Sequence, residues 1–252
     1  MMVYMKKIHI VVINKKIFLI VIILIAIFMS FKTINLFTKI YVNSYTKIIV
    51  IDPGHGGIDG GTTKGGVLEK DINLDLAKRI KAHLEQQKGY LPILTRETDN
   101  SLDTLVNSSG SRHQRDLMAR VDIINNSNAQ LFLSIHGNCH KSNLNADGSI
   151  VLYNDRFQQN KALAYYLQRA LNNIEIDGKK RTVHDPQNHP DFFLLNNSKI
   201  PGVIIETAFL SNQKELQLLG EDGFKDEIAK AIVSGIKKYF NESEEVNLYK
   251  HD

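Results

Sequence analysis

The chain has 252 residues, enough for one large or two small domains. Its formal net charge of +4 comes from the first 45 residues, which hold six lysines and no acid; the remainder has 25 basic and 27 acidic residues, a net charge of −2. This balance excludes the basic surface of a nucleic-acid-binding domain, and the single cysteine, Cys139, excludes an intramolecular disulfide and a cysteine-based zinc site.

An apolar segment over residues 17–37 has Lys32 as its one charged residue. Its 21 residues can cross a hydrocarbon core of about 30 Å if Lys32 snorkels. Four lysines precede it, so the positive-inside rule predicts a cytoplasmic N-terminus over residues 1–16, a transmembrane anchor over 17–37 and a linker over 38–45. A cleaved signal peptide, which would give a secreted protein, is the alternative, although no small-x-small cleavage site follows Phe31.

From Thr46 to about Phe240, short apolar runs alternate with amphipathic stretches. The runs are rich in β-branched residues, as buried strands are. We expect strands at Lys47–Ile51, Leu91–Thr95, Leu131–Ile135, Ser149–Tyr153, Phe192–Leu195 and Val203–Ile205.

Between these runs, apolar residues recur at helical spacing. The expected helices contain Ile72–Leu84, Leu117–Ile124, Leu163–Leu171, Leu216–Leu219 (with Ser211 as the N-cap) and Ile228–Ile236. The alternation predicts a single α/β domain over residues 46–241, with a mostly parallel, twisted sheet of about six strands flanked by helices. Residues 242–252 read as a polar tail.

Three of the expected strands lead into side chains that bind metals or transfer protons, namely His55, His136 and Glu206. In an open α/β sheet the ligand crevice lies beyond the carboxyl ends of the strands, so we expect these side chains at one edge. Catalytic zinc usually takes three protein ligands from His and carboxylate groups and leaves the fourth position to water. His55 and His136 are two candidates. Glu69, which opens the helix after the glycine-rich loop 54–66, is the best third.

Glu206 would then stay uncoordinated. A carboxylate beside a metal-activated water can accept its proton and later deliver it to a leaving amine. The combined set therefore predicts a zinc hydrolase, with one Zn²⁺ per chain, that cleaves an amide.

Taken singly, these residues also have structural interpretations. A histidine at a strand end is often a satisfied structural residue, and Glu69 could be a solvated first-turn residue that complements the helix dipole. A phosphate-binding loop is excluded, because the third glycine of a dinucleotide motif would fall at Asp59 and no Gly-Lys-Ser/Thr follows. Arg96, at a strand end, could bind a substrate carboxylate or serve as a structural ion-pair partner. Asn138 is a further candidate for substrate binding.

Four blocks resemble the zinc-dependent N-acetylmuramoyl-L-alanine amidases: Ile51–Gly57, Glu69–Leu74, Ser134–Asn138 and Ile205–Asn212. They occur in order over about residues 46–240. The resemblance implies an α/β fold and cleavage of the amide between the lactyl group of N-acetylmuramic acid and the L-alanine of a peptidoglycan stem peptide. By matching position it makes His55, Glu69 and His136 the zinc ligands and Glu206 the catalytic acid/base.

The N-terminal anchor and the segment Ser111–Arg120 look like the sporulation amidases, which help form muramic-δ-lactam in spore cortex. Gly137 and Cys139 depart from this pattern, since alanines are expected on either side of Asn138. We expect a single-pass protein of the cytoplasmic membrane with its catalytic domain outside, for example in the intermembrane space of a forming spore. A zinc peptidase acting on stem peptides, a cell-separation amidase and a non-catalytic cell-wall-binding module are the alternatives, and the need for an activating partner protein stays open.

Overall fold

The computed structural model describes residues 15–248 and contains two compact units, Met1–Thr46 and Lys47–Asp252. In the first unit, helix α1 (Lys15–Tyr45) continues through residues 38–45, so the predicted linker is helical. The predicted cytoplasmic segment lies almost entirely in residues 1–14, outside the described residues, as do the side chains of residues 17, 18 and 35–45. Within the described part of the chain no helix is long and apolar enough to span a membrane, so the predicted transmembrane helix over residues 17–37 is not supported.

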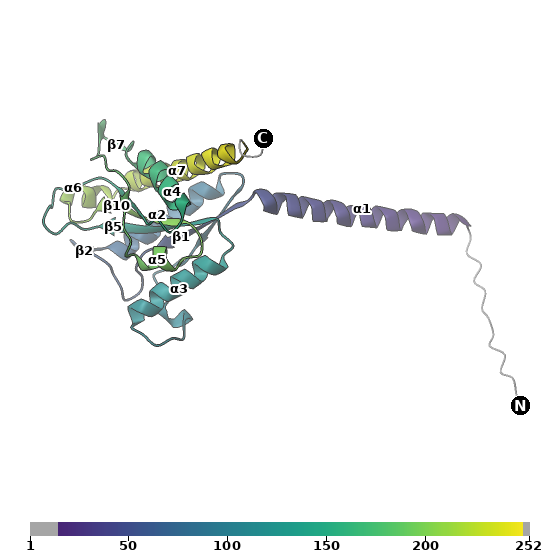
Figure 1. Cartoon of the computed structure of the whole chain (residues 1–252), viewed down its shortest axis with the longest axis horizontal. Coiled ribbons are helices and arrows are strands. Elements are labelled where there is room, and N and C mark those ends of the chain that lie inside the picture. The colour runs from purple at the N-terminus through teal and green to yellow at the C-terminus, as the bar shows by residue number, and fades with distance from the viewer. Residues whose placement is uncertain (1–14, 249–252) are drawn as a thin grey trace, which may run out of the picture. The chain divides into compact units, whose positions relative to one another are not determined.

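The second unit is built on a six-stranded sheet (Figure 1). The strand order is β4 (Tyr90–Leu94), β1 (Lys47–Pro53), β5 (Leu131–Asn138), β10 (Gly202–Phe209), β6 (Ile150–Tyr153) and β9 (Gln187–Asn188). The first four are parallel, β6 is antiparallel to β10, and β9 is parallel to β6. The sheet is therefore mixed, and the predicted parallel arrangement is confirmed for its first four strands.

Helices cover both faces of this sheet, with α4 and α7 on one side and α3 and α5 on the other (Figure 1). The helices are α2 (Glu69–Glu85), α3 (Arg112–Asn126), α4 (Gln158–Leu171), α5 (Phe193–Asn197), α6 (Gln213–Leu218) and α7 (Asp222–Leu248). Successive strand residues point to opposite faces. Ile49 and Ile51 therefore pack in a cluster with α2, α4 and α7, whereas Val50 and Phe132 pack with α3 and α5. All four side chains are completely buried.

Smaller elements lie in the connections between these layers. They are β2 (Thr63–Lys64), β3 (Val67–Leu68), the 3-10 helix η1 (Asp103–Leu105), β7 (Glu175–Ile176) and β8 (Lys179–Lys180). The pair β2–β3 is a hairpin within the glycine-rich stretch that ends at α2, so it sets where α2 begins.

Five of the six expected strands are present, and one expectation is wrong. Phe192–Leu195 does not form a strand: Phe192 is the N-cap of α5 and the other three residues lie in that helix. The sixth strand is the two-residue β9. A short apolar run cannot be distinguished from a buried helical turn by periodicity. The two residues of β9 are exposed and polar, so they carry no apolar pattern.

Two helix boundaries also differ from the sequence-based expectation. The N-cap of α6 is Asn212, whose side chain accepts a hydrogen bond from the backbone N–H of Lys214 at 2.9 Å, and not Ser211. Helix α7 continues to Leu248, so residues 242–248 of the predicted polar tail are helical.

A buried ion pair stabilises the carboxyl end of β1. Asp52 is completely buried, and Nη1 of Arg120 on α3, itself 2% exposed, donates to its Oδ1 at 2.6 Å. The hydroxyls of Thr95 and Ser134 donate to the same carboxylate at 2.6 and 2.7 Å. Burial alone would raise the pKa of Asp52, but Arg120 and the two hydroxyls together lower it. The carboxylate is therefore ionised inside the fold.

We expect Arg120→Met to lower the free energy of unfolding by about 3–5 kcal/mol, because it leaves the Asp52 carboxylate buried without its cation. Urea denaturation followed by circular dichroism measures the change. Arg79→Met is the matched control, since Arg79 pairs with the partly exposed Asp75 and the exposed Asp222 and should lose about 1 kcal/mol or less. Equal losses in the two variants would contradict the assigned role of the buried pair.

Candidate metal centre and active site

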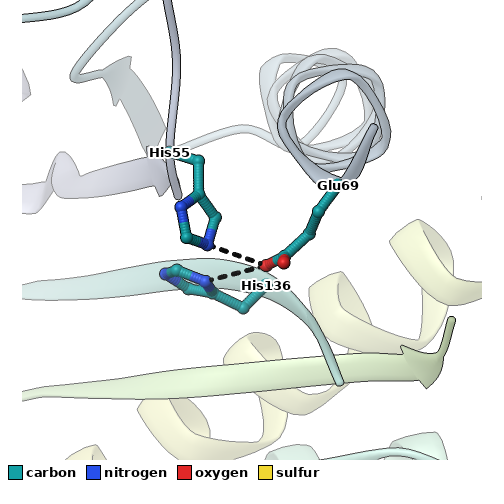
Figure 2. Close-up of side chains that lie close together, drawn as sticks. All are labelled: His55, Glu69 and His136. Atoms are coloured by element: carbon teal, nitrogen blue, oxygen red, sulfur yellow. Dashed lines mark hydrogen bonds and ion pairs between the residues drawn. The ribbon is translucent and has the colours of Figure 1, made fainter. Parts of the chain in front are cut away.

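Three side chains from three different segments meet at the carboxyl ends of β1 and β5 (Figure 2). Nε2 of His55 lies 3.1 Å, and Nδ1 of His136 lies 3.2 Å, from the same atom, Oε1 of Glu69. One potential ligand atom from each residue lies within 4.8 Å of the other two. Two imidazole nitrogens and one carboxylate oxygen are a donor set of catalytic zinc sites. The structure thus brings together the three residues predicted as ligands, in an arrangement that can hold a metal ion.

His55 occupies an unusual backbone conformation just after β1. Its φ is 60°, in the left-handed region that non-glycine residues seldom adopt. Nη2 of Arg120 donates to the carbonyl oxygen of His55 at 2.6 Å, so the surrounding structure maintains this conformation. The preceding Gly54 packs against the His136 ring, because a Cβ added at Gly54 would lie 2.2 Å from Cε1 of His136. A side chain at that position would displace the second imidazole.

Glu69 is the first residue of α2 and is 3% exposed. The backbone N–H groups of Thr62 and Gly137 donate to its carboxylate at 2.8 and 3.2 Å. Burial alone would raise the pKa of Glu69, but the neighbouring His136 and His55 lower it far below its usual range. A solvated first-turn residue, the structural alternative, does not fit this burial. The carboxylate is ionised, as a metal ligand must be.

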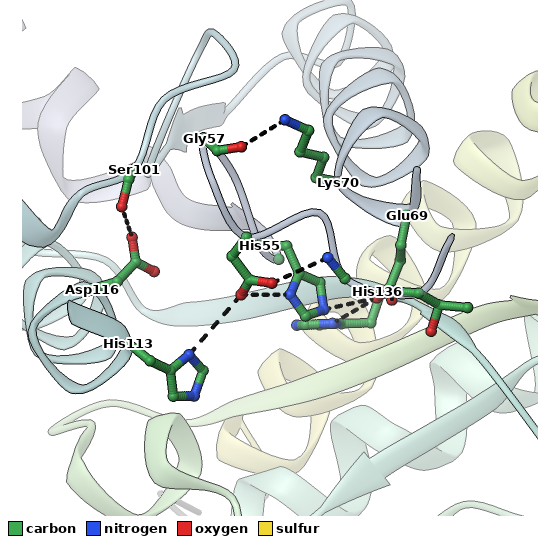
Figure 3. A network of polar contacts seen from close by, with 12 residues as sticks. His55, Gly57, Glu69, Lys70, Ser101, His113, Asp116 and His136 are labelled. Atoms are coloured by element: carbon green, nitrogen blue, oxygen red, sulfur yellow. Dashed lines mark hydrogen bonds and ion pairs between the residues drawn. The ribbon is translucent and has the colours of Figure 1, made fainter. Parts of the chain in front are cut away.

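Asp59 is a candidate functional residue that the sequence interpretation missed. Its Oδ2 lies 2.9 Å from Nδ1 of His55, and metal-binding histidines usually donate their second ring N–H to such a carboxylate. Burial alone would lower the pKa of His55, but Glu69 and Asp59 raise it to about 9. Nδ1 of His113 on α3 lies 4.0 Å from the same Asp59 oxygen and extends the network (Figure 3). The sequence signal for this contact was an aspartate four residues after His55, inside the glycine-rich loop.

Glu206 lies in β10 and pairs in register with His136 of β5. Both residues lie within their strands, not beyond the ends. Oε2 of Glu206 is buried and has no hydrogen-bond partner among the described residues. Burial raises the pKa of Glu206. An unpaired buried carboxylate is unfavourable, and such groups are concentrated in active sites.

The two candidate substrate-binding residues differ in their surroundings. Arg96 is 3% exposed and donates to the backbone carbonyls of Pro53 and Gly54, both at 3.0 Å, and of Lys70 at 2.9 Å. Arg96 could have bound a substrate carboxylate or served as a structural residue. These contacts favour the structural role, in which Arg96 donates hydrogen bonds to backbone carbonyl oxygens. Asn138 ends β5 and is half-buried, and the role of its side chain in substrate binding stays a prediction.

Comparison with known proteins agrees with this geometry. The family model described as N-acetylmuramoyl-L-alanine amidase (Amidase_3) matches residues 49–238, which include all four residues of the site. The chain belongs to this family, and it is an N-acetylmuramoyl-L-alanine amidase that acts on peptidoglycan.

Individual relatives match about three quarters of the chain. The germination-specific N-acetylmuramoyl-L-alanine amidase of Bacillus subtilis (strain 168) is 40% identical over 199 residues, which are 78% of this chain and 81% of that protein. The amidase LytC of the same organism is 35% identical over 76% of this chain, but the match spans 35% of LytC. Among solved structures, the CwlD amidase from Clostridioides difficile in complex with the GerS lipoprotein has a TM-score of 0.70 and 36% identity, covering 78% of this chain and 99% of that chain.

The raised pKa of Glu206 predicts a pH-dependent stability difference. Because the pKa of Glu206 in the folded state exceeds the ordinary glutamate value of 4.5, ionisation destabilises the folded state as the pH rises above about 4.5. We expect Glu206→Gln to raise the free energy of unfolding of the metal-free protein at pH 7 by about 1–3 kcal/mol, and the gain to shrink as the pH falls toward 4. Urea denaturation at both pH values in the presence of a chelator measures it. A gain that is the same at both pH values would contradict the assignment to ionised Glu206.

Proposed function

We propose that this amidase is zinc-dependent, with His55, Glu69 and His136 holding one zinc ion and Glu206 acting as the catalytic acid/base. The observation that carries the proposal is the meeting of two imidazoles at one buried carboxylate, next to Glu206, whose buried Oε2 has no hydrogen-bond partner in the described part of the chain. The donor set fits zinc, and the open fourth position of such sites suits hydrolysis.

Different residues of the chain have different roles in amide cleavage. A bound zinc ion would supply Lewis acidity toward the scissile carbonyl and toward water. The free carboxylate oxygen of Glu206 accepts the proton of the attacking water, and the raised pKa allows Glu206 to pass that proton to the leaving amine. Asp59 holds the proton on Nδ1 of His55, so Nε2 keeps its lone pair for the metal.

Glu206→Gln should lower kcat by about 10²–10⁴-fold, because it removes the group that transfers the proton. The zinc content should not change, since Glu206 is not one of the proposed ligands. Mass spectrometry of muropeptide products measures the activity, and elemental analysis measures the zinc. Glu97→Gln, at an exposed carboxylate outside the site, is the control and should keep full activity.

The same product analysis tests the reaction. An amidase releases peptides that begin with L-alanine, whereas a zinc peptidase leaves L-alanine attached to muramic acid. Full activity of the Glu206→Gln variant would remove Glu206 from the mechanism.

Asp59→Asn should weaken zinc binding by about 10–100-fold, because the carboxylate that orients His55 is lost. Competition with a chromogenic chelator measures the affinity. Asp122→Asn, at an exposed aspartate of α3, should leave the affinity unchanged. If both variants bind zinc like the unmodified protein, Asp59 does not orient the ligand.

We infer a role in spore cortex, where the amidase would help to form muramic-δ-lactam. The name of the germination-specific relative from Bacillus subtilis supports this role over a general one in cell separation. Cortex muropeptides from cells that lack the gene should then contain no muramic-δ-lactam, and an unchanged lactam content would favour the cell-separation role. The relative solved with a lipoprotein suggests that an accessory protein assists here too. Full activity of the purified chain alone would argue against that need.

We also propose that the catalytic domain lies outside the cytoplasmic membrane, where peptidoglycan lies, and that α1 attaches it to the membrane. Lysines before and within the first turn of α1 support this orientation. The exposed apolar side chains of α1, among them Leu24 (59%) and Phe31 (65%), support the attachment itself. Protease added to protoplasts should digest the catalytic domain. Complete protection of the domain would overturn this location.

A further inference from the structure

A pocket of about 220 Å³ opens beside Glu206, on the sheet face that α3 and α5 cover. Its apolar wall includes Leu117 of α3, Leu194 of α5 and Phe192, which immediately precedes α5. Glu206, His136, His113 and Ser134 are the polar residues of its lining. The pocket is therefore continuous with the proton-transferring carboxylate.

The position of Glu206 fixes which part of the substrate lies in this pocket, if the proposed function holds. Glu206 hands its proton to the nitrogen of the scissile amide, so that nitrogen must lie within hydrogen-bond distance of the carboxylate. The group bonded to the nitrogen is the first residue of the stem peptide. Its Cα and side chain must then lie next to Glu206, where the pocket opens.

The size and lining of the pocket agree with that occupant. Its volume is below the range of about 300–1,000 Å³ that holds drug-sized ligands, so it suits one small residue better than a disaccharide. Sugar hydroxyls placed against Leu117, Leu194 and Phe192 would lose their hydrogen bonds, which is unfavourable. A methyl group placed there would be removed from water, which is favourable.

We propose that this pocket is the subsite for the side chain of the first stem residue, and that Leu194 and Phe192 limit that residue to a small apolar side chain. Leu194 is 6% exposed and belongs to the packed cluster on this face, so neighbouring side chains hold it in position. Phe192 is half-buried, and the centroid of its ring lies 4.5 Å from that of the His189 ring.

Two variants at the wall and one control test the subsite. The substrates are disaccharide peptides that differ only in the first stem residue, which is glycine, L-alanine or L-valine. Leu194→Ala and Phe192→Ala widen the pocket at a buried and at a half-buried position, so the second stays informative if the first folds poorly. Leu195→Ala is the matched control, because Leu195 is the next residue of the same helix and is 1% exposed but does not line the pocket.

The unmodified enzyme should cleave the L-valine substrate with a kcat/KM at least about tenfold below that of the L-alanine substrate, since one or two extra methyl groups change specificity by this order. Leu194→Ala and Phe192→Ala should reduce that preference about tenfold. Leu195→Ala should keep it, even if the variant is less stable.

Unchanged preference in both wall variants, with the L-alanine substrate still cleaved, would overturn the subsite and leave the proposed function intact. Failure of the unmodified zinc-loaded enzyme to release peptide from any of the substrates would instead overturn the proposed function, and the subsite with it.

Discussion

The site depends on one buried carboxylate, that of Glu69, which two imidazoles approach within 3.1 and 3.2 Å. Negative charge inside a fold is unfavourable unless cations or hydrogen-bond donors surround it. Glu69 meets this condition through His55, His136 and two backbone N–H groups. The glycine-rich loop, the start of α2 and the end of β5 must all be in place for this to happen. The centre therefore requires the folded arrangement of all three segments.

Two buried arginines, Arg120 and Arg96, support the backbone next to this centre. Arg120 donates to the carbonyls of Pro53 and His55, and Arg96 donates to those of Pro53 and Gly54. Backbone carbonyls in a turn would otherwise need water, which a closed core does not supply. The guanidinium groups fix the course of the chain just before the first imidazole, so they act on the centre without belonging to it.

The sequence was sufficient to predict the parts of the fold that carry a strong apolar pattern. The strands that deliver His55, His136 and Glu206, and the helix that begins at Glu69, all lie where their apolar runs indicated. Among the strands, one error falls at Phe192–Leu195, where the apolar run is too short to distinguish a strand from a helical turn. The other falls at β9, whose exposed polar residues show no apolar pattern. Asp59 was missed because its contact with His55 depends on how the loop folds. The spacing of apolar residues does not predict such a contact.

His136 and Glu206 face each other across two hydrogen-bonded parallel strands. The separation of their Cα atoms is therefore set by the hydrogen-bonded strands and not by the conformation of loops. Alternation along β10 also means that a single inserted residue upstream of Glu206 would turn its carboxylate toward the helix layer formed by α2, α4 and α7. Natural variation in this enzyme should thus accumulate as changes of length in the surrounding loops, while the spacing along these two strands tolerates no insertion.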